Sequence, residues 1–89
     1  MLKITRVNET VATAVLKLEG KVMAQWAVLL EEECQSLLRQ GKTLVLDCVG
    51  VNFLDDRGAE ILRRLPMNDV TLIGAPGFVT ELLQIGGRP

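Results

Sequence analysis

The chain has 89 residues, the size of one small domain, and we treat residues 1–89 as a single unit. Its 10 basic and 11 acidic residues are mixed along the sequence, so no block of one sign indicates binding to nucleic acid or to an anionic membrane. No apolar run approaches the roughly 20 residues that cross a bilayer, and the first residues lack the apolar block of a signal peptide. We therefore expect a cytoplasmic protein that does not insert into membranes.

The composition also argues against catalysis and bound cofactors. The chain has no histidine and no tyrosine, so the commonest general acid and base is missing. The two cysteines, Cys34 and Cys48, lack the spacing of a zinc site and are expected to be small core residues. The sequence thus predicts neither an enzyme nor a metal or cofactor site.

The first half predicts two strands and a helix. Apolar and polar residues alternate over Leu2–Val7 and again over Val11–Glu19, which is typical of a hairpin. Gly20 and Lys21 are expected to end the second strand. A helix is expected over Ala24–Arg39, and its apolar stripe consists of Trp26, Leu30, Cys34, Leu37 and Leu38.

The second half repeats a strand–helix order. Lys42–Cys48 has the β-branched composition of a mostly buried strand and is followed by a connection over Val49–Leu54. Asp55 or Asp56 can cap a helix over Arg57–Leu65. The breaker 66–68 precedes a strand at 69–73, a turn at 74–77 and a last helix at 78–85.

The order ββαβαβα predicts an α/β fold with a mixed sheet of about four strands and helices packed on it. Strands joined through helices favour parallel pairing, so the N-terminal hairpin is expected at one side.

The central stretch resembles a known family. A strand, a short connection, the pattern Val-x-Phe-Leu-Asp-x-x-Gly and an apolar helix resemble the STAS domain of bacterial anti-sigma-factor antagonists. The residues that carry the resemblance are Leu44–Asp47, Val51, Phe53, Leu54, Asp55 and Gly58, with Leu18-Glu19-Gly20 before them and Val79, Leu82, Leu83 and Gly86 after them.

The chain departs from that family at its regulated position. Phosphorylatable members carry a serine or threonine at the start of the helix, where this chain has Asp56 and Arg57. The only serine is Ser36, on another predicted helix. A phosphorylation switch at the usual place is therefore not expected.

The resemblance implies a non-catalytic module that binds a regulatory protein through the start of the second helix. The expected partner-binding residues are Phe53, Asp55, Asp56, Arg57, Gly58 and Glu60. The implied partners are an anti-sigma factor of the kinase type, a signalling assembly or the ATPase of a transporter. The alternatives are an accessory subunit of an ABC-type lipid transport complex, a weak nucleotide- or anion-binding domain, and a module that acts through a homodimer.

Several of these residues also have a simpler structural interpretation, in which they contact no partner. In that interpretation Asp55 caps the helix, Gly58 allows close helix packing, and Arg57 forms a solvated ion pair. A further interpretation, which we favour less than these structural roles, is that Asp47, Asp55 and Asp56 hold a metal ion or accept a phosphoryl group. Trp26 is expected in the core, whereas a partly exposed Trp26 would indicate a docking surface.

Overall fold

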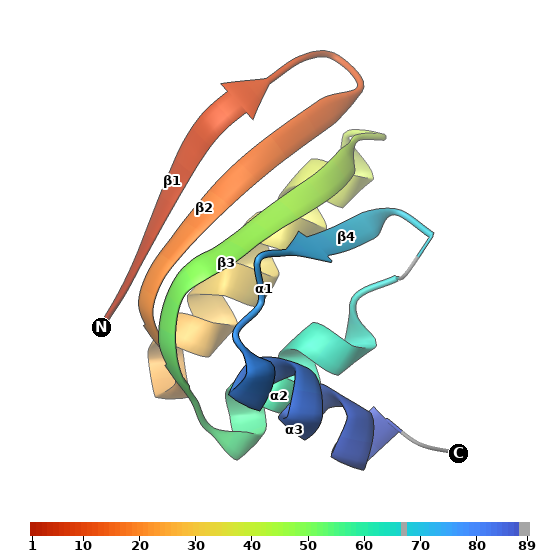
Figure 1. Cartoon of the computed structure of the whole chain (residues 1–89). Coiled ribbons are helices and arrows are strands. Elements are labelled where there is room, and N and C mark those ends of the chain that lie inside the picture. Colours follow the sequence, from red (N-terminus) through yellow and green to blue (C-terminus); the bar gives the residue numbers. More distant parts are fainter. Residues whose placement is uncertain (67, 88–89) are drawn as a thin grey trace.

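The computed structural model describes residues 1–66 and 68–87 of the chain, and Figure 1 shows its arrangement. The predicted order ββαβαβα is confirmed. The elements are β1 (Leu2–Glu9), β2 (Thr13–Val22), α1 (Ala24–Arg39), β3 (Thr43–Leu54), α2 (Asp56–Arg64), β4 (Val70–Ile73) and α3 (Gly77–Gly87). The last helix thus begins one residue earlier than expected and continues through Gly86 and Gly87.

The four strands form one mixed sheet in the order β1-β2-β3-β4. The first two strands are antiparallel, whereas β2 with β3 and β3 with β4 are parallel. Helices α1 and α2 both cover the same face of the sheet (Figure 1). This is expected because the crossovers β2–α1–β3 and β3–α2–β4 advance in the same direction along the sheet, and parallel crossovers share one handedness. The predicted mixed sheet, with the hairpin at one side, is therefore confirmed.

The core lies between this face of the sheet and the helices. Along β2 the alternation predicted from sequence is borne out, since Ala14, Leu16 and Leu18 are fully buried. Both cysteines are free thiols in the core, as expected from their spacing. Within the described residues, no helix is long and apolar enough to cross a membrane.

Two predicted breaks in the sheet are wrong. The second strand does not end at Gly20 and Lys21, and the connection expected over Val49–Leu54 is instead the last part of β3. The two segments pair with each other: Gly20 lies opposite Val51 and Lys21 opposite Phe53. Gly20 remains in the strand at a φ of 110°, which a glycine adopts without strain.

Helix α1 has the predicted bounds but a slightly rotated apolar face. Its fully buried residues are Ala27, Leu30, Cys34 and Leu37. Leu38 is half-buried against the core, whereas Trp26 is half-buried and lies at the margin of the buried face. The expected place of Trp26 in the core is therefore wrong.

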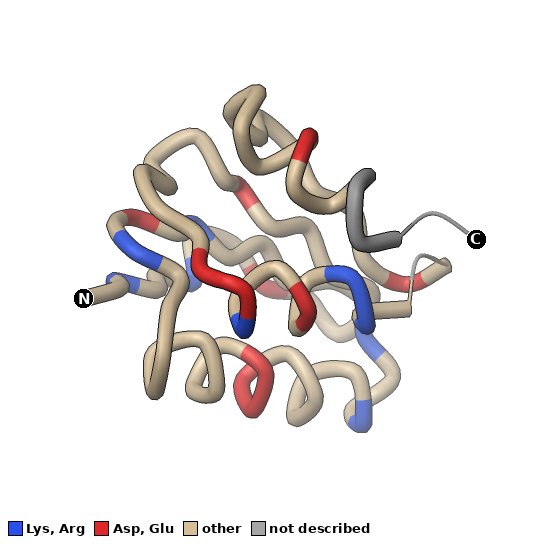
Figure 2. The backbone as a smooth tube through the Cα atoms, turned by 90° about the horizontal axis from the view of Figure 1, so that it is seen from below, with Lys and Arg blue, Asp and Glu red and all other residues tan. Residues whose placement is uncertain are grey.

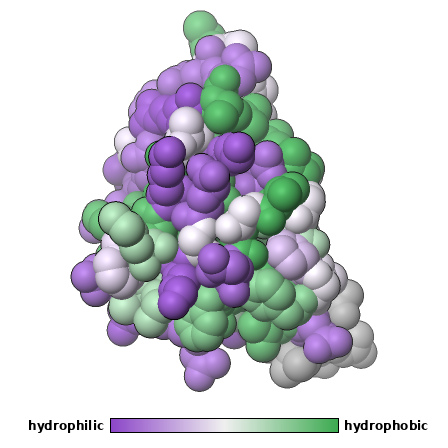
Figure 3. Space-filling model, turned by 60° about the vertical axis from the view of Figure 1, so that its left-hand side comes forward, coloured by the Kyte–Doolittle hydropathy of each residue, from purple (hydrophilic) through white to green (hydrophobic). Residues whose placement is uncertain are grey.

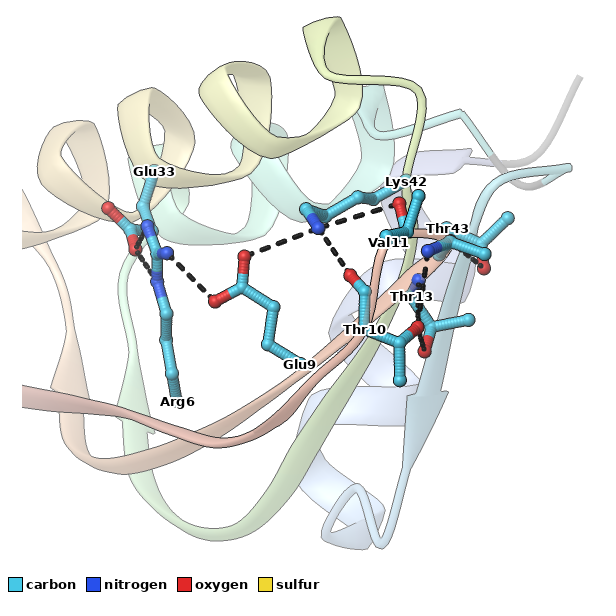
Figure 4. Close-up of polar contacts among 9 residues, drawn as sticks. Arg6, Glu9, Thr10, Val11, Thr13, Glu33, Lys42 and Thr43 are labelled. Atoms are coloured by element: carbon cyan, nitrogen blue, oxygen red, sulfur yellow. Dashed lines mark hydrogen bonds and ion pairs between the residues drawn. The ribbon is translucent and has the colours of Figure 1, made fainter.

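A buried lysine closes the end of the sheet where the hairpin turns (Figure 4). Only 9% of the Lys42 side chain is exposed. Its ammonium donates to the backbone carbonyl of Thr10 and pairs with a carboxylate oxygen of Glu9 at 3.3 Å. Arg6 connects that carboxylate to α1, because it contacts both Glu9 at 3.2 Å and Glu33 at 2.7 Å. The hairpin is thus tied to the helix layer by charge-assisted bonds.

The last helix packs beside α2 and does not cover the sheet (Figure 1). Val79 is fully buried, and Arg63 donates from Nη1 to the carbonyl oxygen of Leu82 at 3.1 Å. The connection between α2 and β4 is short, as predicted. Of its expected breaker, Met67 lies outside the described residues, whereas Pro66 follows the end of α2.

Candidate partner-binding surface

Asp55 joins the starts of α1 and α2. It is the N-cap of α2, where its Oδ1 accepts from the Gly58 N–H at 2.7 Å. Its Oδ2 accepts from the Ala24 N–H, the first residue of α1, at 3.0 Å. Of the two candidate caps, the structure therefore selects Asp55, and both of its carboxylate oxygens are engaged within the chain.

The residue that Asp55 holds has an unusual backbone. Ala24 has a φ of 49°, in the left-handed region that residues with a Cβ rarely adopt. Such a conformation persists where surrounding contacts determine it. The bond from Asp55 is one such contact, and it fixes how the chain turns from β2 into α1.

Gly58 lets α2 approach the sheet closely. A Cβ at this position would lie 2.2 Å from the Val22 carbonyl oxygen and 3.0 Å from Cδ1 of Leu54. Only glycine fits without a shift of the backbone, so the packing interpretation of Gly58 is confirmed. Because Gly58 is buried, its contribution to the surface is the position that it gives the helix.

The outward side of the α2 start carries the remaining predicted site residues. Asp56, Arg57 and Glu60 are exposed, and Phe53, at the end of β3, is 43% exposed. These four side chains come from one continuous stretch, since only Leu54 and Asp55 separate Phe53 from the helix. The stretch from the end of β3 into the first turns of α2 therefore exposes an aromatic ring and three charges of mixed sign.

Arg57 occupies a position that does not favour a cation. It lies in the first turn of α2, where the helix dipole is positive and an acidic residue is preferred. Within the described part of the chain, Arg57 takes part in none of the ion pairs, so the expected local pair with an aspartate does not form. Its guanidinium is thus available in solvent beside Asp56.

A shallow groove of about 330 Å³ runs between α1 and α2 beside Arg57. Its lining residues are Val28, Glu31, Asp56, Arg57, Glu60, Ile61 and Arg64. Figure 2 shows α1, with its acidic segment, running next to the alternating charges of α2. Arg64 bridges the groove, because it bonds Glu31 of α1 at 2.8 Å; it also forms an ion pair with Glu60 of its own helix at 3.6 Å. The sequence reading missed this groove, since Val28 and Glu31 are placed beside α2 only by helix packing.

Over residues 1–66 and 68–87, the three aspartates considered for a metal site, Asp47, Asp55 and Asp56, do not form one. Because β3 continues to Leu54, Asp47 lies in its interior and not at its carboxyl end. The Asp47 carboxylate accepts from the Val49 N–H at 3.1 Å, next to an irregularity in the pairing of β2 with β3. Among the described residues, no group of three acids or cysteines is arranged to hold a metal ion.

Fold and site define a small α/β domain with a charged helix start at the end of a long strand. A family model described as "Mlab, STAS domain" matches residues 5–88, and the chain therefore belongs to the STAS domain family. The resemblance found in the sequence is thereby confirmed.

A solved structure of the anti-sigma factor antagonist SpoIIAA, in its unphosphorylated form, has the same fold. The likeness has a TM-score of 0.74 at 16% sequence identity and covers 94% of this chain and 84% of that chain. No curated protein matches this chain significantly.

Proposed function

We propose that this chain is a non-catalytic module that binds a regulatory protein through the start of α2, without phosphorylation there. Phe53, Asp56, Arg57 and Glu60 provide the contact surface, while Asp55 and Gly58 position it. In the phosphorylatable members of the family that the sequence resembles, this place carries the regulated hydroxyl. Here it carries a fixed positive charge.

The observation that supports the proposal most strongly is the placement of Arg57. A cation in the first helical turn opposes the helix dipole, which lowers stability by about 0.3–1 kcal/mol relative to an acidic residue. Arg57 recovers none of this through an ion pair with the described residues. A bidentate bond to a carboxylate of a partner accounts for an arginine at this place.

The surroundings of Arg57 suit a protein surface. Arg57 lines the groove between α1 and α2, and the partly exposed Phe53 precedes it by four positions in the chain. An aromatic residue and an arginine are the residue types that dominate binding energy at protein interfaces. The acids around them set the charge pattern that a partner must match.

The family resemblance implies three classes of partner: an anti-sigma factor of the kinase type, a signalling assembly, or the ATPase of a transporter such as a lipid transport complex. Under this proposal each of these partners binds the same helix start. Capture and identification of the partner decides among them.

The test is affinity capture from the native host with the wild type and with Arg57→Glu. Arg39→Glu is the matched control, because it reverses an exposed arginine on α1, away from the groove. We expect one specific protein to be captured by the wild type and by Arg39→Glu and lost with Arg57→Glu, while circular dichroism shows all three folded. Capture of the same protein by all three variants would show that the helix start is not the interface.

A second variant tests the bidentate bond itself. Arg57→Lys keeps the charge but loses the planar fork of donors. Affinity for the captured partner should fall by roughly tenfold, which is less than the loss with Arg57→Glu. Equal affinity of the lysine variant and the wild type would mean that Arg57 acts only as a point charge.

A further inference from the structure

Strand β1 is an open edge of the sheet. In the described part of the chain it has one neighbouring strand, β2, and the far side of its backbone faces solvent (Figure 1). The strand has eight residues and no proline. An edge of this length can pair with another strand unless it is blunted.

The backbone groups that point outward can be assigned from the hairpin register. Lys21 donates its N–H to the Met1 carbonyl oxygen at 2.8 Å, so this pair is hydrogen-bonded toward β2. Hydrogen-bonded and non-hydrogen-bonded pairs alternate along an antiparallel ladder. The N–H and C=O groups of Leu2, Ile4 and Arg6 therefore point away from β2, toward the open edge.

An irregularity limits the part of the edge that can pair. The register of β1 against β2 shifts between Arg6 and Asn8, so Val7 is an extra residue that disturbs the edge beyond this point. The regular segment is Leu2–Arg6, with Ile4 at its centre. The outward N–H and C=O groups of this segment lie on its first, central and last residues. Two copies of the segment can therefore pair antiparallel about a two-fold axis that passes beside Ile4.

Apolar side chains lie beside this edge on α1. A groove next to β1 is lined by Ile4, Leu29, Glu32 and Glu33. Leu29 is 53% exposed, and the half-buried Trp26 lies one turn before it on the same side of the helix. The contact of Arg6 with Glu33 shows that this side of α1 faces β1.

From these observations we infer that two copies of the chain pair antiparallel through β1, with Ile4 of one copy opposite Ile4 of the other. The outward groups of Leu2, Ile4 and Arg6 then bond those of the second copy. Leu2 lies opposite Arg6 and Lys3 opposite Thr5 of the second copy, so no like charges face each other. The two Leu29 side chains face the seam from both copies.

Backbone bonds and not a large apolar patch drive this pairing. Figure 3 brings the β1 side of the molecule forward and shows hydrophilic atoms over its middle with hydrophobic atoms around them. The proposed dimer is therefore concentration-dependent. It is also compatible with the proposed partner site, because the groove beside β1 and the groove beside α2 share no lining residue.

The first test is sedimentation of the purified chain across a concentration series. The wild type is expected to form a dimer, and Leu29→Glu should weaken dimerisation by about tenfold or more, since it places two like charges at the seam. Val49→Glu is the control, because Val49 is 68% exposed but lies on β3. A wild type that stays monomeric overturns the proposal, and so does a dimer that Leu29→Glu leaves unchanged.

The second test reads the register directly. In the proposed dimer, Lys3 of one copy and Thr5 of the second copy form a non-hydrogen-bonded pair. The Cα atoms of such a pair lie about 4.5 Å apart, a distance that suits a disulfide. Mixing Lys3→Cys chains with Thr5→Cys chains under oxidation should give a cross-linked dimer in high yield, whereas either variant alone should not. A dimer that cross-links equally in all three samples, or in none, refutes this register.

Discussion

Asp55 and Ala24 are 31 positions apart in the sequence and are joined by a hydrogen bond of 3.0 Å from the Ala24 N–H to the aspartate Oδ2. The same carboxylate caps α2 through its other oxygen. One side chain therefore fixes the starts of two helices against each other, beside the exposed Arg57.

Replacing Asp55 with alanine should destabilise the protein by about 1–2 kcal/mol, because the cap and the partner of Ala24 are both lost. Asp55→Asn keeps a capping oxygen and should cost less. Urea unfolding followed by circular dichroism measures both changes. Asp56→Ala, next to it and exposed, is the control; it loses only the favourable interaction with the helix dipole, about 0.3–1 kcal/mol, and should cost less than Asp55→Ala. Similar losses for Asp55→Ala and Asp56→Ala would contradict the proposed role of Asp55.

Gly58→Ala should destabilise the protein by about 1–3 kcal/mol, because the new Cβ meets the Val22 carbonyl. The matched variant is Gly77→Ala, since a Cβ at Gly77 meets nothing within 4 Å. It should be neutral or slightly stabilising. The difference in unfolding free energy between the two variants isolates the close approach of α2, and equal values would contradict it.

Arg57→Glu should act in opposite directions on stability and on binding. A glutamate in the first turn of α2 suits the helix dipole, so the unfolding free energy should rise by about 0.3–1 kcal/mol. Binding of the captured partner should be lost. Thermal unfolding at low salt measures the first effect. If Arg57→Glu instead lowers the unfolding free energy, the loss of binding could come from unfolding, and this result would contradict the proposed function of Arg57.

Stability in acid should depend on Glu9. The hydrogen bond from Lys42 and then that from Arg6 hold the pKa of the Glu9 carboxyl below its usual value. A lowered pKa in the folded state contributes stability that is fully present above the usual glutamate pKa of about 4.3 and is lost as pH falls through the lower folded-state pKa.

Glu9→Gln should therefore flatten the dependence of unfolding free energy on pH below the usual glutamate pKa of about 4.3. Glu32→Gln removes an equal charge without touching Lys42, and it should leave this slope as in the wild type. Denaturant titrations at a series of pH values measure the slopes. Identical slopes for the wild type and Glu9→Gln would show that the network does not couple to folding.

The two thiols should react slowly in the folded protein. Burial raises the pKa of Cys34 to about 12 and that of Cys48 to about 11, so little thiolate forms at neutral pH. A colorimetric thiol reagent should label both only after unfolding in denaturant. Fast labelling of the native chain would show that the core opens readily.

Local patterns in the sequence were enough for the elements whose signals are local. The bounds of α1, Ala24–Arg39, follow from its apolar period and from the glycine after it. The inward residues of β2 follow from alternation, and a cap at the start of α2 follows from an aspartate before an apolar helix. The departure from the phosphorylated pattern at Asp56 and Arg57 was also visible in the sequence alone.

The tertiary structure decided the features that depend on distant neighbours. Gly20 and Val49–Leu54 look like breaks because glycine and mixed polarity weaken a strand locally. They nevertheless form strand because each segment supplies the other's hydrogen-bond partners. For the same reason only the fold shows that Asp55 holds Ala24, that Lys42 is buried beneath the hairpin, and that Arg57 lies beside a groove. A side chain's role depends on the donors and charges that folding places around it, and the order of residues along the chain does not specify those neighbours.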